Sequence, residues 1–420
     1  MNQLMSLIGI PVLLAMAWAI SAHRGRIQWQ TVLVGLGLQL LLAAFVLWVP
    51  FGRTVFETLG AGFVKLVGFT QVGAEFVFGD LASSERSGFI IAFQVLPTIV
   101  FFASLMACLY HLGVMQKVVE AMAWVMVRFM KVSGAESLAT AANTFVGQTE
   151  APLVIRPFIA GMTRSELFAL MTGGMATIAG GVLAAYVMLL GGADPAQQAY
   201  FAKHLISASI MAAPGALVVA KLILPEVEPS ETMGLVRTTI RREQGNLIEA
   251  AAAGAGDGLK LALNVGAMLL AFLALIALIN WPLGWLGSVT GLEAWVGHPI
   301  DLALLLGWLC APLAFLIGVP LDEAVAVGGL IGQKIVANEF VAYLALTESQ
   351  TQLSDRAVLL STYALCGFAN FSSIAIQLGG IGGLVPERRA EIAQLGLKAL
   401  FGGTLVSLLN ACWAGLLVAS

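Results

Sequence analysis

Long apolar runs separated by short polar stretches dominate the pattern of hydrophobic and polar positions along the chain. A helix of about 20 apolar residues crosses a hydrocarbon core of roughly 30 Å, whereas the strands of a membrane barrel alternate apolar and polar positions. The pattern therefore predicts an all-α integral membrane protein. We expect eight transmembrane helices, at about 5–22, 31–50, 88–110, 165–190, 201–224, 259–280, 355–379 and 392–418.

Two segments between these runs carry charges on a helical apolar pattern. In residues 53–86, Val55, Leu59 and Phe63 recur at roughly helical spacing among charged residues and glycines, and residues 112–131 mix aromatic and aliphatic side chains with basic ones. Such mixtures are typical of helices that lie along a membrane surface. We predict an interfacial helix on the outer side from the first segment and one on the cytoplasmic side from the second.

Two polar segments are predicted to enter the membrane and return on the same side. The first follows a capping box formed by Ser133 and Glu136. Its part from 143 to 158 is too short for two crossings and too polar for one. The second, 322–345, is rich in glycine and holds Glu339. Both segments are interpreted as re-entrant hairpins.

Two of the expected spans contain sequences that disfavour a continuous helix. A capping box of Thr163 and Glu166 opens the fourth span, whose middle reads TGGMATIAGGV (172–182). Each glycine in this stretch lowers helix stability by about 1 kcal/mol relative to alanine. The seventh span is interrupted around CGFANFSS (366–373). Because a broken helix exposes backbone carbonyls at membrane depth, the fourth span is a candidate cation site.

The order of these parts repeats within the chain. Residues 88–224 and 259–420 each contain a span, an apolar segment with tryptophan, a polar hairpin with a glutamate, a broken span and a plain span. Because each copy crosses the membrane an odd number of times, the second copy is inverted relative to the first. Inverted repeats of this kind are a common plan of secondary transporters. Residues 1–87 would form N-terminal spans with an interfacial helix, and 225–258 a cytoplasmic connection. Chance similarity between apolar segments is the alternative explanation.

Composition and charge exclude several classes of protein. With 59% hydrophobic and 11% charged residues, the chain has too little polar surface for a soluble globule of its length. The four cysteines lie in apolar runs and predict no disulfide. Phosphate-binding loops, HExxH and CxxC patterns do not occur in the sequence, so ATP-driven transport and zinc chemistry are unsupported. We expect no nucleic-acid partner.

The basic residues predict the topology. Segment 23–26 and segment 386–389 are basic, and so is the connection that holds Arg237, Arg241 and Arg242. The positive-inside rule places all of these segments in the cytoplasm. Both termini are therefore predicted to lie outside.

The first hairpin offers candidate chemistry around Glu150. A carboxylate in such apolar surroundings costs about 3 kcal/mol and usually faces a partner, a cavity or a ligand. Gln148 and Thr149 add an amide and a hydroxyl, and together these groups suit a neutral, hydrogen-bonding ligand such as a heterocyclic base. By helical spacing, the face of Glu150 also holds Asn143, Val146 and Gly147.

The second half of the chain offers a matching set of polar residues. Asn370, Ser373 and Gln377 share a helical face, although Gln377 receives no role. Glu339 is expected to be a second buried carboxylate, and Lys334, five residues earlier, is a candidate local partner for an acid. Bonding between helices, worth about 0.6 kcal/mol per contact, is the alternative role for Gln148, Thr149, Asn370 and Ser373.

Four segments resemble the concentrative nucleoside transporters, and they occur in the order found in that family. These segments are GQTEAPLVIRP (147–157), GGMATIAGGVLAAY (173–186), NEFVAY (338–343) and CGFANFSSIA (366–375). The chain looks like a bacterial member with eight spans. The resemblance implies a multi-pass protein of the bacterial inner membrane, surrounded by lipid, which forms a homotrimer. Each protomer would have a scaffold domain and a mobile transport domain that carries nucleoside in elevator fashion.

The resemblance also implies roles for particular residues. The nucleobase of a nucleoside such as uridine would be bound by the first hairpin, at Gly147, Gln148, Thr149 and Glu150, with Val182 as apolar surround. The ribose hydroxyls would be bound by Glu339, Asn370 and Ser373, with Phe368 nearby. No cofactor is implied.

For the coupling ion, the resemblance implies sodium bound by side chains of Asn143 and Thr177 and by backbone carbonyls of Val146 and Ile178. Oxygen ligands suit a hard cation of this kind. Proton coupling remains an alternative, since some relatives use protons. Two other interpretations of the residues are a carrier for an anion such as a dicarboxylate, which would need a buried arginine, and an intramembrane enzyme that uses Glu150 and Glu339 as acid and base. A transporter rather than an enzyme is expected.

Overall fold

The computed structural model describes residues 1–234 and 245–418, in which every element of more than one residue is a helix. The strand pairing found among these residues is a single isolated bridge between Ser133 and Met233. The prediction of an all-α protein is therefore confirmed. The basic residues Arg237, Arg241 and Arg242, predicted to lie in the cytoplasm, fall outside the described residues.

The N-terminal part is made of three long helices and three short ones. They are α1 (Asn2–Ala19), η1 (Arg24–Arg26), α2 (Trp29–Leu47), α3 (Pro50–Phe78), η2 (Gly79–Ala82) and α4 (Ser84–Ser87). Helices α1 and α2 match the first two predicted spans. Helix α3 starts with a proline, whose fixed φ and missing N–H suit a first helical position.

The first predicted repeat holds two short hairpin helices and the first broken span. Its elements are α5 (Ile91–Gln94), α6 (Leu96–His111), α7 (Val114–Met130), α8 (Gly134–Asn143), α9 (Ala151–Val154), α10 (Arg156–Ile159), α11 (Arg164–Ala176), α12 (Gly180–Gly191) and α13 (Pro195–Ile223). Both predicted capping boxes are present, at Ser133 with Glu136 and at Thr163 with Glu166.

The second predicted repeat has the same order of parts. Its elements are α14 (Leu247–Thr290), α15 (Leu292–Val296), α16 (Leu302–Leu316), α17 (Ala324–Val336), α18 (Glu339–Ser349), α19 (Asp355–Leu365), α20 (Phe371–Leu384), η3 (Pro386–Arg388) and α21 (Arg389–Leu417). Helix α14 has 44 residues and extends beyond both ends of the predicted sixth span, 259–280. Four consecutive alanines at 250–253 favour extending this helix beyond the apolar run.

Both predicted helix breaks are present, and they lie against each other. Helix α11 ends at Ala176 and α12 begins at Gly180, while α19 ends at Leu365 and α20 begins at Phe371. The amide of Phe368 donates a hydrogen bond of 3.3 Å to the carbonyl oxygen of Thr177. Gly367 has a φ of +145°, and a Cβ there would stand 2.9 Å from the Ala176 oxygen. A glycine thus permits the two broken helices to approach.

Eight helices among the described residues are long and apolar enough to cross a membrane. The number equals the predicted number of spans, but the members differ. The segment Pro50–Ala82, predicted to lie along the surface, is long and apolar enough to cross a membrane. The predicted seventh span is absent from the eight because its two halves have only 11 and 14 residues. The interfacial placement of α3 and the re-entrant course of both hairpins therefore remain predictions.

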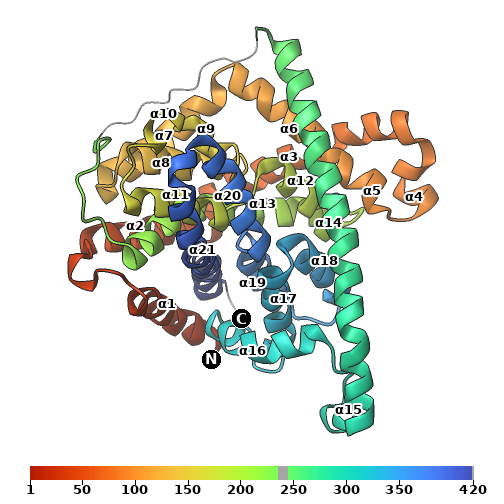
Figure 1. Cartoon of the computed structure of the whole chain (residues 1–420). Coiled ribbons are helices and arrows are strands. Elements are labelled where there is room, and N and C mark those ends of the chain that lie inside the picture. The colour runs from red at the N-terminus through yellow and green to blue at the C-terminus, as the bar shows by residue number, and fades with distance from the viewer. Residues whose placement is uncertain (235–244, 419–420) are drawn as a thin grey trace.

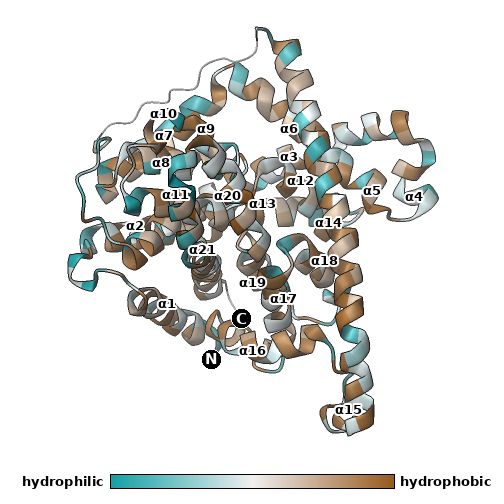
Figure 2. Cartoon of the chain, in the orientation of Figure 1, coloured by the Kyte–Doolittle hydropathy of each residue, from teal (hydrophilic) through white to brown (hydrophobic). Residues whose placement is uncertain are grey.

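Burial separates central helices from peripheral ones. In the most apolar 18 residues of Arg164–Gly191, Pro195–Ile223 and Pro386–Leu417, 89% of the residues are buried. In the corresponding part of α14, 11% of the residues are buried. Figure 1 shows α14 running along one side of the molecule, and Figure 2 shows that much of this helix is hydrophobic. An apolar helix with so little protein around it suits contact with lipid or with another chain.

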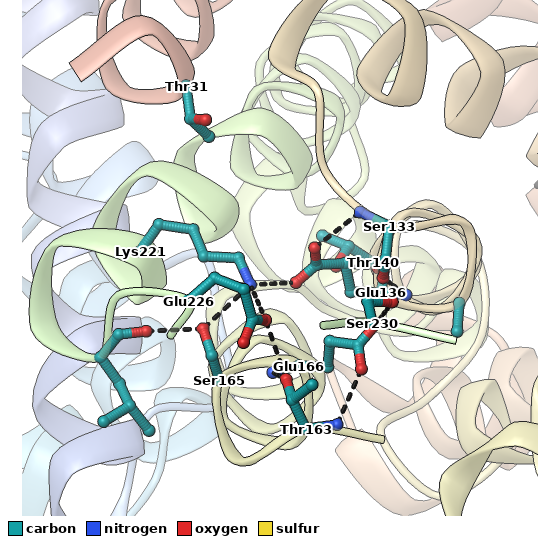
Figure 3. A network of polar contacts seen from close by, with 12 residues as sticks. Thr31, Ser133, Glu136, Thr140, Thr163, Ser165, Glu166, Lys221, Glu226 and Ser230 are labelled. Carbon is teal, nitrogen blue, oxygen red and sulfur yellow. Dashed lines mark hydrogen bonds and ion pairs between the residues drawn. The ribbon is translucent and has the colours of Figure 1, made fainter. Parts of the chain in front are cut away.

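A buried polar network fastens the starts of α8 and α11 to the end of α13 (Figure 3). The ammonium group of Lys221 pairs with Glu136 at 2.7 Å and with Glu226 at 3.3 Å. It also donates to the hydroxyl of Ser165 at 2.9 Å. Removing one partner of a buried ion pair costs several kcal/mol, so this network holds the first hairpin and the first broken span as one unit.

Candidate functional site

The carboxylate of Glu339 is held by both broken helices. Glu339 is the first residue of α18, behind an N-cap in which the Asn338 side chain accepts a hydrogen bond of 2.9 Å from the amide of Val341. Its Oε1 accepts a bond of 2.7 Å from the hydroxyl of Tyr186 on α12. Its Oε2 accepts a bond of 3.0 Å from Nδ2 of Asn370, the residue before α20. The second hairpin, α12 and α20 therefore meet at one carboxylate.

The orientation of Asn370 is fixed by its role as a helix cap. Its Oδ1 accepts hydrogen bonds from the amide of Ser373 at 2.9 Å and from the hydroxyl of Ser372 at 2.7 Å. An asparagine whose oxygen caps a helix must direct its NH2 group elsewhere, and here that group points to Glu339. The break in the seventh span thus positions a donor for the carboxylate.

The first hairpin joins the same set of contacts through Gln148. Its Nε2 donates to the hydroxyl of Ser373 at 3.0 Å, and its Oε1 accepts from Nε2 of Gln377 at 3.0 Å. Gln377 also donates to the carbonyl oxygen of Met171 on α11 at 2.9 Å. The result is one buried polar chain, which we call the hairpin-to-hairpin network: Tyr186, Glu339, Asn370, Ser373, Gln148 and Gln377.

The structure brings together four of the residues predicted to bind substrate, namely Gln148, Glu339, Asn370 and Ser373. Sequence reasoning missed the roles of Tyr186 and Gln377. Tyr186 ends the quoted GGMATIAGGVLAAY segment, and a tyrosine in an apolar helix usually needs a partner for its hydroxyl, which was the available signal. Gln377 was placed on the correct face of its helix, but no partner could be named for it.

The remaining predicted substrate residues border this network. Val182 is buried, whereas Gly147, Thr149 and Phe368 are half-buried. A Cβ at Gly380 on α20 would stand 3.1 Å from the Thr149 side chain, so the first hairpin packs on that helix. Glu150 is exposed and takes no part in the hairpin-to-hairpin network. The network therefore centres on Glu339 and Gln148, and a role of Glu150 in binding substrate stays a prediction.

The predicted sodium ligands lie between α8 and the break in the fourth span. Asn143 is 1% exposed, and neither of its side-chain polar atoms has a hydrogen-bond partner. Thr177 donates its hydroxyl to the carbonyl oxygen of Gly173 at 2.9 Å, and a Cβ at Gly173 would stand 3.6 Å from Nδ2 of Asn143. A buried amide without a protein partner is costly, which favours a ligand at this position.

Two further observations bear on the ligand set. The amide of Gly180 donates to the carbonyl oxygen of Phe145 at 2.9 Å, so the backbone of the first hairpin lies against the break, near Val146 and Ile178. The described residues contain no group of three or more His, Cys, Asp or Glu side chains placed to hold a metal. Neutral oxygens from amide, hydroxyl and carbonyl groups suit a hard monovalent cation better than a transition metal.

Comparison with known protein families gives three matches that follow each other along the chain. A family described as the N-terminus of Na+ dependent nucleoside transporters matches residues 8–81. One described as nucleoside recognition matches 92–193, and one described as the C-terminus of Na+ dependent nucleoside transporters matches 204–415.

Individual proteins agree with these matches. The uncharacterized transporter YutK of Bacillus subtilis is 45% identical over 422 residues, which cover 100% of both chains. The human sodium/nucleoside cotransporter 1 is 42% identical over 440 residues, which cover 99% of this chain but 64% of that protein. This chain thus spans less than two thirds of the length of the mammalian relatives it matches.

Solved structures of a protein named CNTnw are similar over almost the whole chain. Its inward-facing, substrate-bound structure has a TM-score of 0.90 at 44% identity and covers 99% of this chain and 98% of that one. A double variant of CNTnw in an outward-facing state has a TM-score of 0.89 at 44% identity, with the same coverage.

Proposed function

The chain belongs to the Na+ dependent nucleoside transporter family, and from this premise we propose that it couples the uptake of nucleosides to the entry of sodium. Membership makes it a multi-pass membrane transporter rather than an enzyme. Related structures in outward-facing and inward-facing states support alternating access.

The observation that carries the proposal is the hairpin-to-hairpin network. A ribonucleoside has a flat base with donors and acceptors at one end and a ribose with 2′-, 3′- and 5′-hydroxyls at the other. Gln148, with Thr149 and Glu150, would bind the base between Gly147 and the apolar side chain of Val182. Glu339, Asn370 and Ser373 would bind the ribose, with Phe368 beside it. The bonds that these side chains now make to each other would be exchanged for bonds to the substrate.

Sodium would bind beside this site, at Asn143, Thr177 and the carbonyl oxygens of Val146 and Ile178. An ion here would hold α8 against the break in the fourth span, and Gln148 follows α8 by five residues. Ion and nucleoside would then each favour the arrangement that binds the other. Such coupling is typically worth about 1–3 kcal/mol, and it is reciprocal.

The proposed movement is of the elevator type, in a homotrimer in the bacterial inner membrane with both termini outside. Residues 1–87 would belong to the scaffold. The apolar, sparsely covered surface of α14 supports contact with lipid and with neighbouring protomers, because a soluble monomer rarely exposes such a surface.

Uptake of radiolabelled uridine into proteoliposomes tests the proposal. Gradients of sodium, potassium and protons are imposed separately, with an excess of competing nucleosides. We expect accumulation above equilibrium with sodium alone. Accumulation with a proton gradient alone would favour the alternative of proton coupling. Competition by a dicarboxylate would favour an anion carrier, and a chemically altered product would favour an enzyme.

A further inference from the structure

Lys334 is a buried cation whose direct hydrogen-bond partners are neutral oxygens. It lies on α17, the first arm of the second hairpin, and is 1% exposed. Its ammonium group donates to the carbonyl oxygen of Ala364 at 2.9 Å and to the hydroxyl of Ser407 at 3.0 Å. Among the described residues, none of the ion pairs within 4.0 Å involves Lys334, although the carboxylate of Glu339 attracts its charge from a greater distance. A buried charge surrounded by neutral oxygens is costly, so a specific role is expected.

One of the two oxygens around Lys334 belongs to the broken end of the seventh span, and the other is the hydroxyl of Ser407 on α21. Helix α19 ends at Leu365, and its last carbonyl groups lack the partners that a continuous helix would provide. Lys334 binds the carbonyl of Ala364 directly, and Ser407 donates to the carbonyl of Cys366 at 2.9 Å. The C-terminal end of a helix carries a partial negative charge, which a cation stabilises. Lys334 supplies that cation inside the protein.

The first predicted repeat has the same order of elements but no lysine at this place. There, α8 is the first arm of the hairpin and α11 is the first half of the broken span, which ends at Ala176. Neither α8 nor the break at 177–179 contains a basic residue. The side chain at the end of α8 is instead Asn143, whose polar atoms have no protein partner. The ends of α11 and α19 therefore face neutral oxygens in one repeat and an ammonium group in the other.

We propose that the ammonium group of Lys334 is a tethered cation that takes, in the second repeat, the place of the coupling ion in the first. This inference rests on the proposed function, because it assumes that sodium binds at Asn143. An amine surrounded by a carbonyl and a hydroxyl has the neutral oxygen ligands that a hard cation would accept. A second sodium is thereby excluded, and transport is limited to one sodium for each nucleoside.

The test compares two substitutions of Lys334. Lys334→Met retains the volume of the side chain but removes the charge, and Lys334→Ala also removes the volume. We expect Lys334→Met to reduce uridine uptake by about tenfold or more, because the end of α19 loses its cation. Lys334→Ala should recover uptake when methylammonium is added, and its Hill coefficient for sodium should rise from about 1 toward about 2. Lys260→Met, which removes an exposed lysine on α14, is the matched control.

Several results would overturn the inference. The first is transport of two sodium ions per nucleoside by the wild type. The second is wild-type uptake and sodium dependence in Lys334→Met, and the third is failure of methylammonium to restore uptake in Lys334→Ala. If the wild type shows no sodium-driven uptake at all, the coupling proposal fails instead. The role of Lys334 as a tethered cation is then tested by thermal unfolding of purified Lys334→Ala. Methylammonium should raise the unfolding temperature of this variant, and choline should not. Equal unfolding temperatures in the two salts would refute the tethered cation.

Discussion

Replacing Glu339 by glutamine should weaken recognition of the ribose while leaving the protein folded. The carboxylate of Glu339 accepts one bond from Tyr186 and one from Asn370. A glutamine of the same size can still accept from Asn370 with its oxygen and donate its NH2 group to the oxygen of Tyr186. The network inside the protein can therefore be rebuilt with neutral groups. The substrate, however, loses a charged acceptor for its hydroxyl groups.

The size of the effect follows from the change of acceptor. Hydrogen bonds to a charged group contribute about 1.5–3 kcal/mol, and those between neutral groups about 0.5–1.5 kcal/mol. The difference is about 1 kcal/mol or slightly more for each ribose hydroxyl. Since 1.4 kcal/mol corresponds to a factor of ten, we expect uridine affinity to fall by about tenfold to a hundredfold when the 2′- and 3′-hydroxyls both bind Glu339.

Competition by nucleoside analogues measures this effect. In the wild type, 2′-deoxyuridine and 3′-deoxyuridine should compete more weakly than uridine, and in Glu339→Gln this preference should shrink by about tenfold. Glu348→Gln, at an exposed position on the same helix, is the matched control and should behave as wild type. Full uridine uptake with unchanged discrimination in Glu339→Gln would refute the ribose role.

Three other substitutions test separate parts of the account. Asn143→Ala should raise the sodium concentration for half-maximal uptake by about 10- to 100-fold, and an unchanged sodium curve would contradict the ion site. Tyr186→Phe removes one hydrogen-bond donor to a charged acceptor, worth about 1.5–3 kcal/mol, and should lower uridine affinity in a binding assay. Wild-type affinity in this variant would show that Tyr186 has no part in the site. Lys221→Met leaves Glu136 buried without its partner and should lower the free energy of unfolding by about 3–5 kcal/mol, which is measured as a lower unfolding temperature. An unfolding temperature equal to that of the wild type would show that the ion pair contributes nothing to stability.

Local sequence patterns predicted the features that depend on neighbouring residues. The capping boxes require only a serine or threonine three positions before a glutamate, and both are present. The break in the fourth span lies at Thr177–Ala179, between the two glycine pairs that predicted it. Each of these features is decided within a few residues, so the sequence contains its cause.

Contacts between distant helices could not be predicted in the same way. Tyr186 and Glu339 are 153 residues apart, and Gln148 and Gln377 are 229 apart, so their contacts depend on how the helices pack. The cost of placing Glu150 among apolar residues indicated a functional carboxylate, but cost alone does not say whether the side chain is enclosed. The partners of Lys334 were likewise missed, because Ala364 and Ser407 lie on two other helices.

Binding of radiolabelled uridine to the purified protein tests the central claim most directly, with sodium and with potassium, in the wild type, Gln148→Ala and Glu339→Gln. If the two hairpins form one substrate site, binding requires sodium and is weakened in both variants. Wild-type affinity in either variant would contradict the account, because one hairpin would then bind uridine without the other.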